Sequence, residues 1–170
     1  DASLGSNTLL LEELDWNGIG LEWDAKHAAS HASRRRNKVL QQDALKTDYT
    51  QLCSQLANEE GVIDYLQLDC EPSATTYEIM TMIPFDKYKF RVITYEHDHY
   101  VDMTGSFREK SREFLRSKGY VLCVPNVSAD EKSPFEDWWV LPQYIENHVM
   151  LRMFKSGDDI TNINEYMLTP

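Results

Sequence analysis

Short stretches rich in β-branched and aromatic residues alternate with stretches of helical periodicity along most of this chain. The strand-like stretches are residues 19–23, 38–41, 62–69, 91–96, 120–126 and 138–141. The helix-like stretches are residues 7–14, 26–36, 50–58, 75–82 and 108–118. Such alternation is typical of crossover connections, which join parallel strands. The pattern therefore predicts an α/β fold with a Rossmann-like, doubly wound and mostly parallel sheet.

Charge and composition limit the partners that such a fold can take. The chain has 170 residues, enough for one domain with a core, and its 17 basic and 28 acidic residues give a formal charge of −11. That charge repels nucleic acid and anionic lipid, and no apolar run approaches the ~20 residues that span a bilayer. Cys53, Cys70 and Cys123 are too widely spaced for a disulfide framework or a zinc ribbon. We expect a cytoplasmic protein that binds neither nucleic acid nor membrane.

Acidic residues follow two of the predicted strands near the start of the chain. Ligands of open parallel sheets bind at the carboxyl ends of the strands, where such residues would lie. Glu22 ends the stretch 19–23, and there a carboxylate can accept hydrogen bonds from both hydroxyls of a ribose. Asp43, after the stretch 38–41, can accept from the exocyclic amine of adenine. Taken alone, Glu22 is more typical of a solvated acid at a strand end, and Asp43 of a turn residue.

The stretches 62–69 and 91–96 end in a denser group of ionisable side chains. Asp69 and Glu71, two residues apart on an extended chain, share one side, where repulsion raises the pKa of at least one of them. Glu96 and His97 follow the next strand, and histidine suits proton transfer near neutral pH. Hence His97, Glu71 and Glu96 are the candidate bases. A metal-dependent hydrolase using Asp69, Glu71, His97 and Asp98 stays open, although their spacing matches no known metal site and we assign no metal ligand.

Taken together, these segments resemble the FkbM-type family of S-adenosylmethionine-dependent methyltransferases. The residues that carry the resemblance are Ser6 to Thr8, Leu10 to Glu12, Trp16 to Glu22, Asp64 to Glu71, Phe85 to Tyr88, Val92 to His97, and Arg112 with Gly119 and Tyr120. The similarity runs from about Ser6 to Leu141. It implies a sheet whose last strand is antiparallel, S-adenosylmethionine as cofactor, and methyl transfer to an oxygen of a small-molecule or sugar acceptor.

The resemblance also implies roles for individual residues. Glu22, with its neighbour Trp23, would hold the ribose side of the cofactor, Asp43 the adenine, and Asp69 the methionine end or the reaction centre. The remaining assignments are Ser6 and Asn7 beside the cofactor, and Glu71, Glu96 and His97 beside the acceptor.

The chain departs from the family in two places. In the family a first strand and a glycine-rich loop come before the position of Ser6, so we expect both to be missing here. Pro72 follows Glu71 where the family often has glycine. We assign residues 1–142 to the methyltransferase-like domain and 143–170 to a docking helix, a homodimer element or a frayed tail. An NAD-dependent oxidoreductase and a non-catalytic binding module remain alternatives.

Overall fold

The computed structural model describes residues 8–101, 104, 106–155 and 157–166. The chain divides into two compact units, Asp1–Leu56 and Ala57–Pro170. The predicted boundary after residue 142 does not coincide with this division, because residues beyond it belong to the second unit. Among the described residues, no helix has the length and apolarity needed to cross a bilayer.

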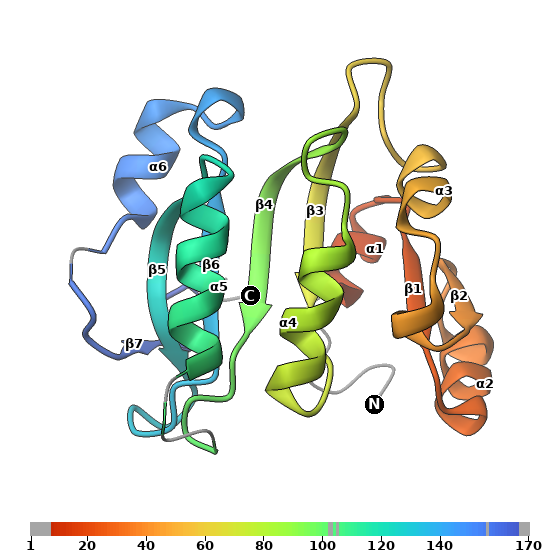
Figure 1. Cartoon of the computed structure of the whole chain (residues 1–170), viewed down its shortest axis with the longest axis horizontal. Helices are drawn as coiled ribbons and strands as arrows, with labels where there is room; N and C mark the ends of the chain where they lie inside the picture. The colour runs from red at the N-terminus through yellow and green to blue at the C-terminus, as the bar shows by residue number, and fades with distance from the viewer. Residues whose placement is uncertain (1–7, 102–103, 105, 156, 167–170) are drawn as a thin grey trace. The chain divides into compact units, whose positions relative to one another are not determined.

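The first unit is built around two parallel strands. Its elements are α1 (Leu9–Glu13), β1 (Ile19–Glu22), α2 (Ala25–Arg34), β2 (Lys38–Gln41), the 3₁₀ turn η1 (Ala44–Lys46) and α3 (Tyr49–Ser54). Helix α2 is the crossover between β1 and β2 (Figure 1). It begins after Asp24, whose carboxylate accepts hydrogen bonds from the backbone N–H groups of Lys26 and His27. The buried Glu12 accepts from the backbone N–H groups of Arg36 and Asn37, which anchors the start of β2 to α1.

The second unit holds a mixed sheet of five strands in the order β3-β4-β6-β5-β7. Its elements are β3 (Val62–Leu68), α4 (Ser73–Met82), β4 (Lys89–Glu96), α5 (Ser106–Ser117), β5 (Val121–Ser128), β6 (Glu136–Val140), η2 (Pro142–Tyr144), α6 (Asn147–Met153), β7 (Thr161–Asn162) and η3 (Ile163–Glu165). Strand β6 is antiparallel to both of its neighbours, so β3, β4 and β5 run in one direction. The carboxyl ends of these three strands therefore lie at one end of the sheet, together with the amino end of β6.

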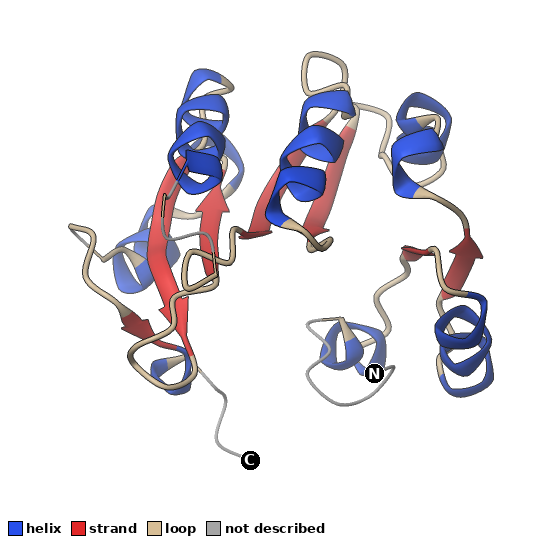
Figure 2. Cartoon of the chain, turned by 60° about the horizontal axis from the view of Figure 1, so that its bottom comes forward, coloured by secondary structure: helices blue, strands red, loops and turns tan. Residues whose placement is uncertain are grey.

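Helices α4 and α5 cover the same face of this sheet, as both views show (Figures 1 and 2). The residues that fill the layer beneath them are large and fully or almost fully buried: Phe85, Ile93, Tyr95, Leu115 and Trp139. A second cluster, formed by Cys123, Val124, Val127 and Val140, packs against Met150 of α6 and Tyr166. Elements that precede residue 142 in the sequence and elements that follow it therefore both pack against this sheet through apolar side chains.

Three of the sequence predictions have the following outcomes. Helix α4 begins at Ser73, two residues before the predicted start and directly after Pro72, because proline in the N-cap position costs the helix no backbone hydrogen bond. Beyond residue 142, α6 contacts β5, and β7, which was not predicted, pairs with β5 in parallel through Thr161 and Asn162. Ser6 and Asn7, assigned to the cofactor site, lie outside the described residues.

Candidate active site

The strand pairing of the second unit sorts its ionisable residues onto two faces of the sheet. Glu96 at the end of β4 pairs with Glu136 at the start of β6, and Tyr95 pairs with Asp137. Neighbouring residues of a strand point to opposite faces, so Glu96 and Glu136 share one face while Tyr95 and Asp137 share the other. Asp69, the residue after β3, comes beside Glu96 in the parallel register. Two separate polar groups result, one on each face.

The first is the acid group, which we define as Asp69, Glu96, Asp98 and Glu136. The Glu96 carboxyl is hydrogen-bonded to Asp69 and to Asp98, and burial together with these neighbours raises the pKa of Glu96 to about 10. Burial also raises the pKa of Glu136 to about 7, against the hydrogen bond that its carboxylate accepts from the indole N–H of Trp138. Asp69 is exposed, whereas the other members are buried or partly buried. Near neutral pH, Glu96 is therefore protonated.

The second group, on the α5 face, is centred on Arg112, which is 1% exposed. Its guanidinium donates two hydrogen bonds to the Asp137 carboxylate, from Nε to Oδ2 at 2.7 Å and from Nη2 to Oδ1 at 2.9 Å. Asn126 adds its backbone N–H to Asp137 and accepts from Arg112 through its own side chain. Although burial opposes it, hydrogen bonding to Arg112 and His97 holds the pKa of Asp137 well below its usual range. This arginine network of Arg112, Asp137, Asn126 and His97 fixes the ends of β4, β5 and β6 to α5.

His97 belongs to the arginine network and not to the acid group. Its ring is 1% exposed, Nε2 lies 3.4 Å from Oδ1 of Asp137, and Nδ1 accepts from the backbone N–H of His99 at 3.2 Å. Both ring nitrogens thus face protein groups, and neither reaches the surface. The prediction that His97 removes a proton from an acceptor does not agree with this geometry, because such a base needs a nitrogen within reach of the acceptor.

Glu71 is exposed, two residues beyond Asp69. Its charge acts on the phenol of Tyr100, whose pKa is raised chiefly by Asp98 and also by burial and by Glu96 and Glu71. Glu71 therefore lies at the margin of the acid group rather than within it. Between Asp69 and Glu71, the backbone N–H of Cys70 donates to the hydroxyl of the buried Thr76, which ties this loop to α4.

The predicted cofactor residues that are described in the first unit lie at the carboxyl ends of β1 and β2. Oε1 of Glu22 accepts from the backbone N–H of Asp24 at 2.8 Å, and the described residues offer Oε2 no hydrogen bond. Trp23, the next residue, is 75% exposed. Asp43 instead caps η1: Oδ1 accepts from the backbone N–H of Leu45, and Oδ2 lies 3.0 Å from Nζ of Lys46. Asp43 thus has the geometry of a turn residue, and Glu22 and Trp23 are the side chains more open to a ligand.

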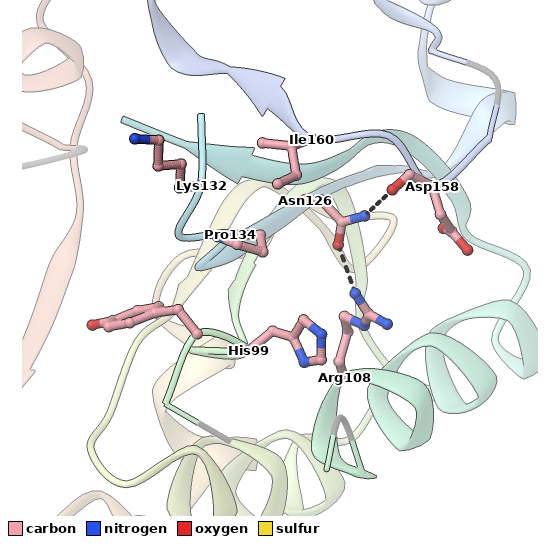
Figure 3. A pocket seen from close by; sticks show the side chains of 8 residues that line it. His99, Arg108, Asn126, Lys132, Pro134, Asp158 and Ile160 are labelled. Carbon is pink, nitrogen blue, oxygen red and sulfur yellow. Dashed lines mark hydrogen bonds between the residues drawn. The ribbon is translucent and has the colours of Figure 1, made fainter. Parts of the chain in front are cut away.

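Several residues at the polar end of the second unit were not predicted. Glu136 and Asp137 are the first residues of β6 and come before the predicted strand 138–141, whereas sequence reasoning searched only the residues that follow strands. A pocket of about 280 Å³ between the ends of β4 and β5 was also missed; Arg108 and Asn126 contribute to its wall (Figure 3). The sequence could have indicated that Asp137 is buried. Asp137 comes two residues before the core residue Trp139, and alternation along a strand places both side chains on the same face.

No family model matches the chain, and no curated protein or solved structure is similar enough to it to count as a match. Within the described ranges, no group of three or more histidine, cysteine, aspartate or glutamate side chains has the arrangement of a metal site. Inferences about function therefore depend on the fold and on the two polar groups.

Proposed function

We propose that the protein is an S-adenosylmethionine-dependent methyltransferase that methylates an oxygen of a small molecule or sugar, as members of the FkbM-type family do. The observation that carries the proposal is the placement of β6, which runs antiparallel between β4 and β5. The resemblance implies an antiparallel last strand. The last strand that the sequence predicted, 138–141, corresponds to β6 and is antiparallel, whereas the two-residue β7 that follows it is parallel to β5. The dinucleotide-binding sheet has the order 3-2-1-4-5-6 with mostly parallel strands. Strand β6 thus favours the methyltransferase over the NAD-dependent oxidoreductase.

Glu22 and Trp23 are the residues proposed to hold the cofactor. The hydrogen bond from the N–H of Asp24 keeps the Glu22 carboxylate at the end of β1, with Oε2 left for a ribose hydroxyl. The exposed indole of Trp23 offers an aromatic face for the adenine. Asp43 is not included, because both of its oxygens already bind local groups. When bound, S-adenosylmethionine supplies an electrophilic methyl group next to a positive sulfur.

The acid group is proposed to supply the base that accepts the proton of the acceptor hydroxyl. Asp69 is the exposed member of the group, so its carboxylate is the one that an acceptor hydroxyl can reach. The hydrogen bond between Asp69 and Glu96 keeps the Asp69 carboxylate oriented while it accepts the proton. A positioned base of this kind contributes typically 10²–10⁴ in rate. In this scheme His97 is a positioning residue, since it orients Asp137 and the end of β4.

Binding of S-adenosylhomocysteine to the full chain tests the proposal. At a hundredfold excess over the dissociation constant the ligand stabilises a protein by about 2.7 kcal/mol, which raises the melting temperature by several degrees. We expect this shift for the wild type and for Glu13→Gln, a control that removes an exposed acid from the same unit. Glu22→Gln should reduce or abolish it.

A folded wild type that melts at the same temperature with and without S-adenosylhomocysteine would refute the proposal. A shift with NAD in its place would transfer the assignment to the oxidoreductase. Equal shifts for wild type and Glu22→Gln would leave the cofactor class intact and remove Glu22 from its site.

A further inference from the structure

The pocket at the carboxyl ends of β4 and β5 has two kinds of wall. Arg108, Asn126 and His99 form a polar side, and Pro134 and Ile160 are apolar (Figure 3); Tyr100 also lines the pocket. Its volume of about 280 Å³ lies just below the range of about 300–1,000 Å³ for ligand pockets. The size and the division of the lining suit a small molecule with one polar and one apolar end.

The polar wall is held rigid from behind by the arginine network. Oδ1 of Asn126 accepts from Nη1 of Arg108 at 3.1 Å and from Nη2 of Arg112 at 3.0 Å. The Asn126 side-chain amide donates to the backbone oxygen of Asp158, and its backbone, with a positive φ of 51°, donates to Asp137. Asn126 therefore fixes the position of the Arg108 guanidinium. A site built this way loses little entropy when a ligand binds.

Arg108 keeps hydrogen-bonding capacity for a ligand. A guanidinium has five N–H donors, and Arg108 directs Nε and Nη2 at Glu109 and one Nη1 donor at Asn126. Within the described residues, no hydrogen bond uses the remaining donors on Nη1 and Nη2, and the side chain is 18% exposed. Lys132, an exposed residue of the same lining, adds a mobile positive charge. Asp158 also lines the pocket, but its carboxylate lies 2.9 Å from Nη1 of Arg112 and is paired there.

From these contacts we infer that this pocket binds a small, partly apolar molecule through a carboxylate or phosphate group. The planar guanidinium of Arg108 recognises the oxygens, Lys132 adds charge, and Pro134, Ile160 and Tyr100 contact the apolar part. The formal charge of −11 of the whole chain repels an anionic ligand at long range. The selectivity of the site for an anion must therefore come from the hydrogen-bond donors that line the pocket. The inference does not depend on methyl transfer.

Titration of the full chain with three probes tests this inference: benzoate, the neutral benzyl alcohol and inorganic phosphate, each followed by calorimetry and by ligand-observed NMR. We expect benzoate to bind more tightly than both benzyl alcohol and phosphate, because it alone offers an anion and an apolar ring. Arg108→Gln should weaken benzoate about tenfold or more, and Lys132→Gln by a smaller factor. Arg116→Gln, a change of the same kind at an exposed position of α5, serves as the control and should bind as the wild type does.

Equal binding of benzoate and benzyl alcohol would overturn the assignment of an anion site. Tighter binding of phosphate than of benzoate would overturn the role of the apolar wall. Lys132→Gln changes an exposed residue and should fold normally. If this variant and a folded Arg108→Gln both bind benzoate with the affinity of the wild type, the inference is refuted. These measurements need neither S-adenosylhomocysteine nor turnover, and their failure is therefore separate from failure of the methyltransferase proposal.

Discussion

Replacing Glu96 with glutamine is expected to stabilise the protein, by an amount that grows with pH. Burial and the carboxylates of Asp69 and Asp98 raise the pKa of Glu96 from 4.5 to about 10. An acid whose pKa is raised on folding adds stability below its unfolded pKa, and this stability is lost as the pH rises toward the folded value. From pH 4.5 to pH 7 the loss reaches about 1.36 kcal/mol per pH unit, or about 3 kcal/mol in all. Partial solvent exposure of Glu96 reduces this figure, so we expect a gain of about 1–3 kcal/mol for Glu96→Gln at pH 7.

Urea unfolding of the wild type and of Glu96→Gln, followed by tryptophan fluorescence at a series of pH values, measures this difference. The two free energies of unfolding should nearly coincide at pH 4.5 and diverge steadily up to pH 9. Glu113→Gln, which changes an exposed acid on α5, is the matched control and should parallel the wild type. A Glu96→Gln difference that stays constant across this range would refute the raised pKa of Glu96.

Two further substitutions test the arginine network and the core. Asp137→Asn removes the buried carboxylate that binds two of the Arg112 donors and leaves the exposed Asp158 as the nearest acid, so it should cost about 3–5 kcal/mol in urea unfolding. Because the pKa of Asp137 is lowered on folding, its stabilising effect should fade as the pH falls below about 4, and a flat acid profile would contradict the pairing. Tyr120→Phe removes the hydroxyl that accepts a hydrogen bond from the buried backbone N–H of Phe90. This change should lower the free energy of unfolding by about 1–3 kcal/mol and speed hydrogen exchange of that amide. Unchanged exchange would show that another group accepts this N–H.

The elements with strong periodicity could be predicted from the sequence. The predicted strand 38–41 coincides with β2, and the predicted helix 108–118 lies within two residues of α5. The region after residue 142 could not be resolved in this way. Strand β7 has only two residues, Thr161 and Asn162, and it exists because β5 offers them a partner. A strand that depends on tertiary pairing leaves no periodic signal in its own sequence.

The candidate site was predicted in part. Asp69 and Glu96 were identified as strand-end acids, and the structure brings them into hydrogen-bonding contact. His97 was grouped with them because it is adjacent in sequence, but adjacent residues of a strand point to opposite faces. Glu136 joins the acids only because β6 is antiparallel, and its amino end therefore meets the carboxyl ends of β3 and β4. Strand direction is a property of the whole sheet, and the local sequence does not encode it.

The pairing of β6 with β4 also constrains how this sheet can assemble. If β6 were displaced by one position, Asp137 would turn toward the carboxylates and Glu136 toward the guanidinium side, while Trp139 would leave the core. Each face would still receive one carboxylate from β6, so charge alone would hardly oppose the error, and the main penalty would be the loss of a buried indole. Trp139 is therefore the residue that specifies the alignment of β6, independent of whatever chemistry the sheet supports.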